Sequence, residues 1–217
     1  MKKTIILLVL SSIVHLSGYA QQKYEKELYV GASAGMNFAS VSFAPRVNTK
    51  MLQAYTGGLL VRWNTENFLG LQAEINYSQH GWNERFDDTK YNYSRTINYV
   101  ELPFFTHIYF GSNKVRGFVN LGPKISYALS ESTDSNLGDE KPNNINVQHD
   151  MPIENKLGWG LCGGPGLEIH TGIGVFSLEG RYYYSLGDIY KSKKIDPFAT
   201  SAHQVMTVKL AYMIRLK

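Results

Sequence analysis

The sequence predicts an all-β protein: an eight-stranded antiparallel up-and-down transmembrane β-barrel with short periplasmic turns and long outer loops. Three observations predict this fold. Apolar and polar residues alternate with a period of two along eight segments, as they do along strands that have one apolar face. The links between these segments are alternately short and long. The chain also begins like an exported protein but has one cysteine, Cys162, so no internal disulfide can stabilise it.

Residues 1–20 are predicted to be a cleaved signal peptide. A short positive region, Met1-Lys2-Lys3, precedes a mainly apolar run from Ile5 to Val14, and small residues lead up to a cut after Ala20. The apolar run is about half as long as the roughly 18 residues that a membrane helix needs. Residues 21–217 are then expected to form one outer-membrane β-barrel domain.

The first four strands are predicted over residues 28–38, 58–63, 69–78 and 99–110. Residues 69–78 show the pattern most clearly, because five apolar residues alternate there with Gly, Gln, Glu, Asn and Ser. The apolar positions of these four segments are Leu28, Val30, Ala32, Ala34, Met36 and Phe38; Leu59, Val61 and Trp63; Leu69, Leu71, Ala73, Ile75 and Tyr77; and Val100, Leu102, Phe104, Ile108 and Phe110.

The last four strands are predicted over residues 115–129, 157–170, 176–185 and 206–216. Their apolar positions are Val115, Val119, Leu121, Ile125, Tyr127 and Leu129; Leu157, Trp159, Leu161, Leu167 and Ile169; Phe176, Leu178, Tyr182 and Tyr184; and Met206, Val208, Leu210, Tyr212, Ile214 and Leu216. The glycines of 157–170 are predicted to permit strand curvature and to make room for large lumen side chains.

The links between the strands indicate a membrane barrel. Tight turns are expected at 64–67, 111–114 and 171–174, and long polar links at 40–54, 83–94, 130–156 and 187–202. The 130–156 link is rich in turn formers and charges and is predicted to be mobile. Strands of about ten residues match the tilted span of a bilayer, and turns that are short at one end only are typical of outer-membrane barrels. Interfacial aromatic girdles are predicted from Trp63, Trp82, Tyr109, Trp159 and Tyr184.

The polar face is predicted to line the lumen and the apolar face to contact lipid. An eight-stranded interior is just wide enough to be filled by side chains, and the polar face offers small residues and charges of both signs. These charges are predicted to form a structural network of ion pairs: Arg62, Glu74, Glu101, Arg116, Lys124, Glu168, Glu179, Arg181, Lys209 and Arg215. Pro103 shares the lumen face with Glu101, and its missing N–H predicts a local bulge or bend.

Candidate chemistry is sparse. Glu74 with Glu101 could be a carboxylate pair, and Glu179 with Arg181 a binding pair, but their shared lumen face favours the structural network. The histidines lack metal-ligand spacing, although a surface contact near the outer rim stays open for His80 and His203. Cys162 is predicted to be a buried, inert lumen residue. No catalytic, metal-binding or cofactor-binding residue is therefore predicted.

Several short motifs resemble the PorT-like outer-membrane β-barrel family. They are Y-V-E-L-P-F-F at 99–105, G-P-K-I-S-Y at 122–127, G-W-G-L-C-G-G-P-G-L-E at 158–168 and L-E-G-R-Y-Y-Y-S-L-G-D-I at 178–189. Phe105 departs from the aliphatic residue usual in that family. The resemblance implies an eight-stranded barrel in the outer membrane of Gram-negative bacteria. It does not imply a settled activity, although the namesake is associated with protein secretion.

These observations favour a non-enzymatic integral outer-membrane protein, a filled anchor that presents surface loops for interaction or envelope assembly. The expected partners are outer-membrane lipid and, through the outer loops, envelope or secretion-system proteins or surface polysaccharide. The net charge of +4 is scattered, which argues against nucleic acid, and a monomer is expected. Two alternatives stay open: a periplasmic lipocalin-like ligand carrier, with apolar residues inside, and a lipid-modifying barrel enzyme.

Overall fold

The computed structural model describes residues 25–138, 140, 142–143 and 145–216, so the predicted signal peptide lies outside the described residues. Eight long strands form the fold: β1 (Glu27–Ala44), β3 (Leu52–Glu66), β4 (Leu69–Glu84), β5 (Tyr93–Gly111), β6 (Val115–Ser135), β7 (Leu157–Thr171), β8 (Gly174–Asp188) and β9 (Thr200–Arg215). The short β2 (Thr49–Lys50) and a 3₁₀ helix, Val147–His149, lie in two of the links. Within the described ranges, no helix has the length and apolar character to cross a membrane.

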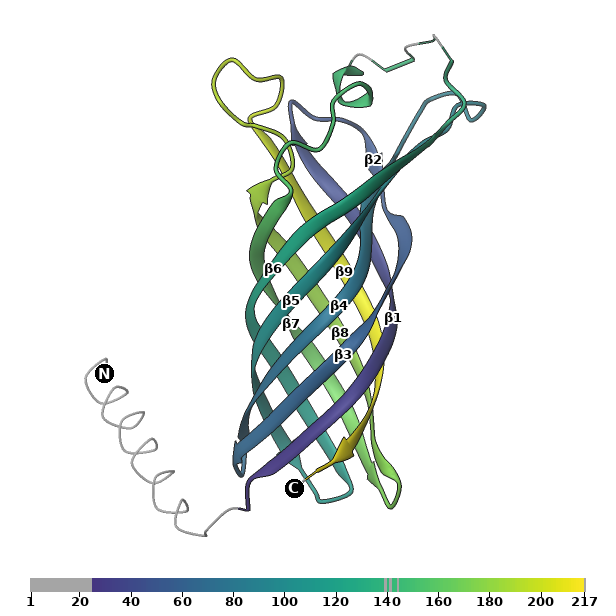
Figure 1. The fold of residues 1–217 in the computed structure, drawn as a ribbon. Coiled ribbons are helices and arrows are strands. Elements are labelled where there is room, and N and C mark those ends of the chain that lie inside the picture. Colours follow the sequence, from purple (N-terminus) through teal and green to yellow (C-terminus); the bar gives the residue numbers. More distant parts are fainter. Residues whose placement is uncertain (1–24, 139, 141, 144, 217) are drawn as a thin grey trace, which may run out of the picture.

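The eight long strands close into a barrel, as the sequence predicts. Each strand pairs antiparallel with its neighbours in the chain, β1 pairs with β9, and β4 pairs with β5. Figure 1 shows the tilted strands, with three tight turns at one end, here called the turn end, and the long links at the other, the outer end. Closure leaves the long strands paired on both sides within the barrel wall, which a sheet in hydrocarbon requires.

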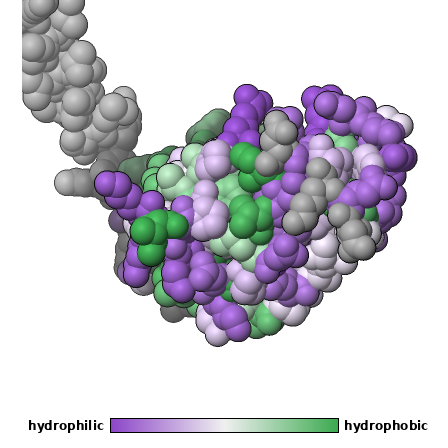
Figure 2. All heavy atoms as spheres, turned by 90° about the horizontal axis from the view of Figure 1, so that it is seen from above, coloured by the Kyte–Doolittle hydropathy of each residue, from purple (hydrophilic) through white to green (hydrophobic). Residues whose placement is uncertain are grey.

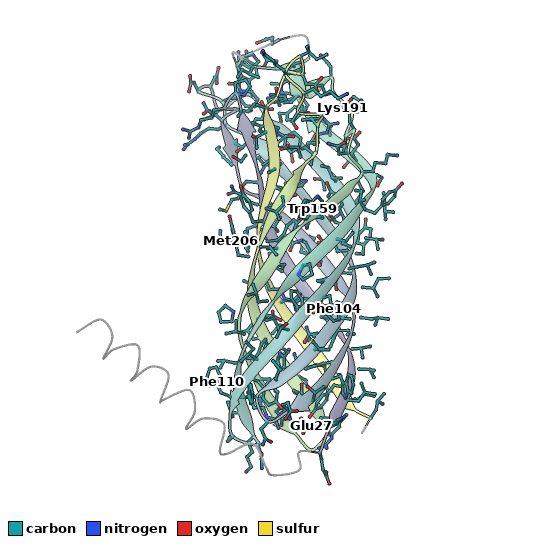
Figure 3. The ribbon with its side chains drawn as sticks, turned by 90° about the vertical axis from the view of Figure 1, so that its left-hand side faces the viewer. Glu27, Phe104, Phe110, Trp159, Lys191 and Met206 are labelled. Carbon is teal, nitrogen blue, oxygen red and sulfur yellow. The ribbon has the colours of Figure 1, made fainter. Side chains whose placement is uncertain are left out.

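The faces of the strands are also as predicted. Alternate apolar residues are exposed on the outside, where Phe104, Phe110, Trp159 and Met206 project from the barrel wall (Figure 3). The residues between them, such as Gln72, point inward and are buried. Gly166 shows why the inner face needs glycine: a Cβ there would lie 2.2 Å from the ring of Phe118, a large lumen side chain.

The strands continue past the predicted boundaries at the outer end. β1, β5 and β6 are 18, 19 and 21 residues long, so the links shrink to 45–51, 85–92, 136–156 and 189–199. Residues 130–135 therefore belong to β6 and not to a loop, which corrects the prediction for that link. Residues 130–135 (S-E-S-T-D-S) are polar on both faces, so they carry no period-two signal.

A change of faces separates two parts of the barrel. In the extended outer part, Val41, Phe43, Trp82 and Ile97 point inward and are buried, whereas polar residues such as Ser42 face out. An apolar inside and a polar outside suit a wall surrounded by water, and the opposite arrangement suits a wall surrounded by lipid. We call the part of the wall with an apolar exterior the apolar band. The change of faces therefore marks the outer edge of this band.

Two predictions about individual residues were wrong. Trp82 and Tyr109 are not girdle residues, because both are buried inside, whereas Trp63, Trp159 and Tyr184 are exposed on the apolar band. Pro103 causes no bulge, since the β4–β5 register is the same on both sides of it, from Ala73↔Phe104 to Asn76↔Glu101. The proline instead interrupts the β4–β5 pairing between these two pairs of residues, as expected of a residue that has no N–H to donate.

Candidate functional site

The barrel interior holds the predicted charges in three layers. The layer nearest the outer end contains Glu101 and Lys124, whose carboxylate and Nζ lie 2.5 Å apart. His80 Nε2 lies 3.1 Å from the same carboxylate, and Lys124 also sits over the ring of Tyr183. Glu101 thus has a lysine partner and a histidine contact, and all three side chains are buried.

The middle layer contains two acids and two bases. Arg181 contacts both oxygens of Glu74, at 2.6 and 2.9 Å, and donates to Glu179 at 2.7 Å. Lys209 Nζ lies 2.7 Å from Glu74 Oε2. All four side chains are buried, so each charge depends on its neighbours for compensation.

The layer at the turn end contains the remaining predicted residues. Arg62 pairs with Glu168, and Arg116 donates to Glu27 at 3.0 Å. Arg215 lies at the rim, half exposed, 3.4 Å from Glu27. Glu27 was absent from the predicted network, although it precedes the first predicted strand and has the parity of Tyr29, which could have identified it.

Neutral polar side chains join the layers. Gln72 accepts from Arg62 at 2.7 Å and donates to Glu74 at 2.5 Å. On β6, Asn120 connects His107 to Glu179 at 2.7 and 2.9 Å. These contacts fill the interior, and the space left among the outer and middle layers is about 20 Å³. An opening this small admits about one water molecule.

The interior geometry gives little basis for catalysis. Ser78 Oγ and Glu101 Oε1 both lie 3.1 Å from His80 Nε2. A catalytic triad needs the serine on one ring nitrogen and the acid on the other, because one nitrogen takes the proton while the other is held. Glu74 and Glu101 occupy different layers and do not act as a carboxylate pair.

The positions of the histidines and of Cys162 give no support for a metal site. His80 and His203 are buried inside the barrel with ring centroids 5.5 Å apart, so neither provides the surface contact that the sequence left open. Within the described ranges, no three His, Cys, Asp or Glu side chains come together as a metal site. Cys162 is buried, as predicted.

The outer end carries a folded apolar cluster that the sequence did not predict. We call it the outer cap; its buried residues are Val41, Phe43, Val47, Trp82, Tyr93, Ile97, Tyr99, Ala128, Leu137, Ile153, Ile189, Tyr190 and Phe198. They come from four strands and from three links between strands. From above, hydrophilic residues form most of the rim of this end, and hydrophobic residues are visible between them (Figure 2). Burial raises the pKa of the Tyr190 hydroxyl, which stays protonated and contacts Arg95 at 3.1 Å.

Buried polar contacts hold the longest link onto the cap. Glu84, at the end of β4, accepts from Gln148 Nε2 at 2.8 Å and from Asn143 Nδ2 at 3.2 Å, and contacts His149 Nε2 at 3.0 Å. Arg95 donates to the Gln148 carbonyl at 2.9 Å. The described part of the link predicted to be mobile is therefore tied to two strands.

Glu84→Ala is expected to release this link without unfolding the barrel. The change removes the carboxylate that accepts from Gln148 Nε2, whose remaining acceptor is the Ile145 carbonyl, and the loss of a hydrogen bond to a charged group costs about 1.5–3 kcal/mol locally. Limited proteolysis should then cleave within residues 140–150 several-fold faster, while the folded barrel keeps its gel mobility. Glu154→Ala, which removes a surface partner of Lys191, should leave the cleavage rate unchanged. Equal cleavage in both variants would contradict the role of Glu84.

The match to a family model agrees with the fold. The outer membrane protein beta-barrel domain family matches residues 19–191. None of the curated proteins matches the sequence significantly. Similar solved structures include OprG from Pseudomonas aeruginosa, 11% identical over 89% of this chain and 97% of that one, with a TM-score of 0.48.

Two further solved structures have a similar degree of likeness. Ail, the attachment invasion locus protein of Yersinia pestis, is 13% identical over 87% of this chain and 99% of that one, with a TM-score of 0.44. The outer membrane enzyme PagL is 12% identical over 85% and 98%, with a TM-score of 0.44. Likeness this distant assigns no activity, whereas the family model spans most of the sequence. The chain therefore belongs to the outer membrane protein beta-barrel domain family.

Proposed function

We propose that this chain is a non-enzymatic outer-membrane protein whose filled barrel anchors the outer cap for interaction at the cell surface. The observation that carries the proposal is the change of faces along β1, β4 and β5, which puts a folded, water-facing structure beyond the apolar band. A wall that served only to span the bilayer would not need strands of up to 21 residues or buried contacts to a link.

The two alternatives have less support. A soluble ligand carrier would hold its apolar residues inside, but here Leu59, Leu210 and many similar residues are exposed around the barrel. A lipid-modifying enzyme would need a nucleophile and base that reach the lipid face, and the Ser78 and His80 pair is sealed in the lumen. The candidate partners of the outer cap are envelope proteins, surface polysaccharide and, by the PorT-like resemblance alone, secretion-system proteins.

Site-specific photocrosslinking in intact cells tests the proposal. Ile195 is 91% exposed at the tip of the 189–199 link, and a photoreactive residue there should capture an envelope protein or surface polysaccharide. Ile173, 73% exposed in a turn-end link, is the matched control and should not yield that product. The same product from both positions, or a product from Ile173 alone, would contradict a surface role for the outer cap.

A further inference from the structure

One strand of the barrel has an unpaired edge at the outer end. β6 pairs with β7 only as far as Tyr127↔Leu157, whereas its pairing with β5 continues to Tyr93↔Ser135. Figure 1 shows β5 and β6 running together to the outer end. Within the described ranges, no strand pairs with the other side of residues 130–135, which we call the β6 edge.

The alternation of the β5–β6 ladder shows which backbone groups are available. Asn136 N donates to the Asn92 carbonyl at 3.2 Å, in the register of the β5–β6 pairs. Neighbouring residues of a strand direct their N–H and C=O groups to opposite sides. Asp134 therefore bonds to β5, whereas Thr133 and Ser135 direct their backbone groups away from it. All residues of the β6 edge are exposed, so another strand has access to these groups.

Acidic side chains determine which kind of strand suits the β6 edge. Glu131 is paired with Arg95, at 2.5 Å. Asp134 is in contact with a neutral amide, Asn92 Nδ2, at 3.4 Å, so its charge is not compensated by that partner. Opposite charges on adjacent strands stabilise the pair and like charges destabilise it. Asp134 therefore favours an added strand that has a basic side chain opposite it.

A small hollow lies beside the start of the β6 edge. It measures about 100 Å³, and Ser130, Glu131, Ile153 and Lys156 are among its lining residues. Ile153 N lies 3.4 Å from Glu131 Oε1, so the 136–156 link forms the far wall of the hollow. In strand addition, main-chain hydrogen bonds hold the added segment, and pockets beside the edge receive alternate side chains. The hollow has about the size of one such side chain.

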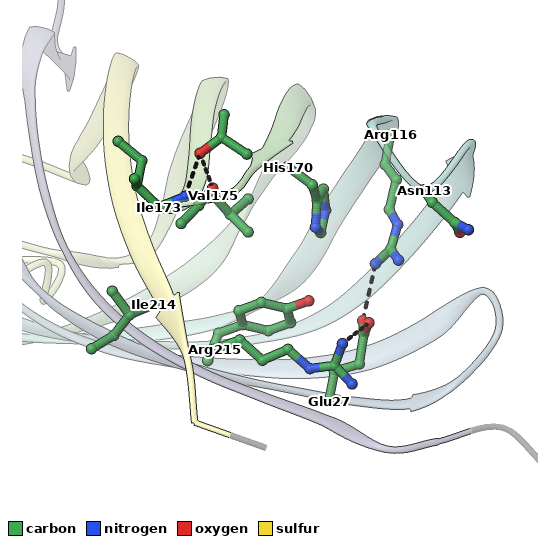
Figure 4. Close-up of a pocket in the computed structure, with 12 residues that line it drawn as sticks. Glu27, Asn113, Arg116, His170, Ile173, Val175, Ile214 and Arg215 are labelled. Carbon is green, nitrogen blue, oxygen red and sulfur yellow. Dashed lines mark hydrogen bonds and ion pairs between the residues drawn. The ribbon is translucent and has the colours of Figure 1, made fainter.

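The turn end of the barrel has no comparable edge within the described ranges, because tight turns join its strands. Its pocket of about 570 Å³ is bordered by Arg116, Arg215 and Glu27, which form ion pairs with one another (Figure 4). Short turns face the periplasm in barrels of this kind. Strand addition is therefore confined to the end that faces away from the periplasm.

A second copy of the chain in the same membrane is an unsuitable occupant of the β6 edge. Two identical antiparallel strands are related by a two-fold axis perpendicular to their sheet. Because β5 and β6 continue the barrel wall, this axis lies in the membrane plane and would turn the second barrel upside down. A parallel pair has its axis along the strands, whose tilt of about 35–45° would rotate the second barrel out of the membrane. A loop or tail of another polypeptide has no such restriction.

We propose that the β6 edge binds an extended segment of another polypeptide, which adds a strand beside β6 at the cell surface. The backbone of the segment bonds to Thr133 and Ser135, a basic side chain lies opposite Asp134, and one further side chain enters the hollow. This inference rests on the proposed function, because it identifies how a partner at the cell surface is recognised.

Fluorescence anisotropy with labelled peptides, on the full mature chain in an uncharged detergent, tests the proposal. The probe is Thr-Lys-Val-Thr-Lys-Val-Thr with blocked ends, and the control is the same peptide N-methylated at two adjacent central residues. N-methylation keeps the side chains and the charge but removes one donor from each edge of the peptide. We expect saturable binding of the probe and about tenfold or more weaker binding of the control, the effect of one lost hydrogen bond. Failure of the probe to bind, or equal binding of both peptides, overturns the proposal.

A proline substitution tests the backbone contact from the side of the protein. Thr133→Pro removes an N–H that points away from the sheet, a position where an edge strand tolerates proline. Binding of the probe should weaken about tenfold or more, again the effect of one lost hydrogen bond. Ile195→Pro, in the exposed 189–199 link, is the matched control and should leave binding unaltered. A heat-dependent shift in gel mobility verifies that each barrel is folded. Equal effects of the two prolines would contradict binding at the β6 edge.

A charge substitution tests the chemistry of the segment without altering the backbone. Asp134→Asn should weaken binding of the cationic probe several-fold, because it removes the negative charge opposite a lysine. Asp150→Asn makes the same charge change in the neighbouring 136–156 link and should have no effect. Unchanged binding in the Asp134 variant would rule out the basic side chain at that position.

Two further results separate this inference from its alternatives. Dimerisation of the chain without peptide, abolished by Thr133→Pro, would make a second copy the occupant and overturn the proposal. If the probe fails to bind while Ile195 captures a surface partner in cells, strand addition is wrong and the proposed function stands. Binding of the probe without capture at Ile195 would instead support the β6 edge and count against a surface role for the outer cap.

Discussion

Leu59→Arg is expected to destabilise the barrel by about 2–4 kcal/mol, the cost of arginine on the lipid face near the bilayer midplane. Leu59 lies at the centre of the apolar residues of β3, which run from Tyr55 to Trp63, and its side chain is 62% exposed. Its cross-strand neighbours are Ala32 and Ile75, so no acid is opposite it to pair with a new charge. The free energy of unfolding in lipid vesicles, from urea titration, measures the effect.

Met51→Arg is the matched control for this prediction. Met51 is 52% exposed, but it precedes β3 at the outer end, beyond the change of faces. The same apolar-to-arginine change should cost less than about 0.5 kcal/mol there, as is usual for surface substitutions. A similar cost at both positions would mean that the apolar band does not end where the faces change.

The alternation of residues predicted the fold because it records which side of the wall each residue faces. Leu71 and Gln72 are adjacent in sequence and lie on opposite faces, and the same rule placed all eight strands. The assignment of apolar residues to the outside failed beyond the apolar band, at the outer end, where Val41, Trp82 and Ile97 point inward. A single sequence gives no independent indication of where lipid ends and water begins, so Val41 was placed in a polar link and Trp82 in an interfacial girdle.

The partners of the lumen charges were less predictable than their positions. Parity put Arg181, Glu74 and Lys209 on one face of three strands, but their contacts span up to 135 residues of sequence. Such contacts depend on the strand register and on closure, which alternation does not encode. The link contacts of Glu84 were missed for a related reason, because a loop residue such as Gln148 has no periodic pattern that would place it.

The second large loss of stability is expected from a substitution in the middle lumen layer. Arg181→Met should destabilise the barrel by about 3–5 kcal/mol, the usual cost of removing one partner of a buried ion pair. Arg181 compensates Glu74 and Glu179 together, and after its removal Lys209 alone faces two buried carboxylates. The methionine fills much of the vacated space against Phe105, over whose ring the guanidinium lies. The lost free energy of unfolding therefore measures charge compensation more than packing.

A double variant distinguishes charge compensation from any other role of Arg181. Adding Glu179→Gln to Arg181→Met leaves Glu74 with Lys209, so the layer is neutral again. The double variant should then recover at least half of the lost free energy of unfolding, a coupling that a double-mutant cycle measures directly. Additive costs of the two changes would mean that the four side chains do not act as one network. Recovery would instead show that neutrality of the middle layer, rather than any single contact, allows these four charges inside a barrel surrounded by lipid.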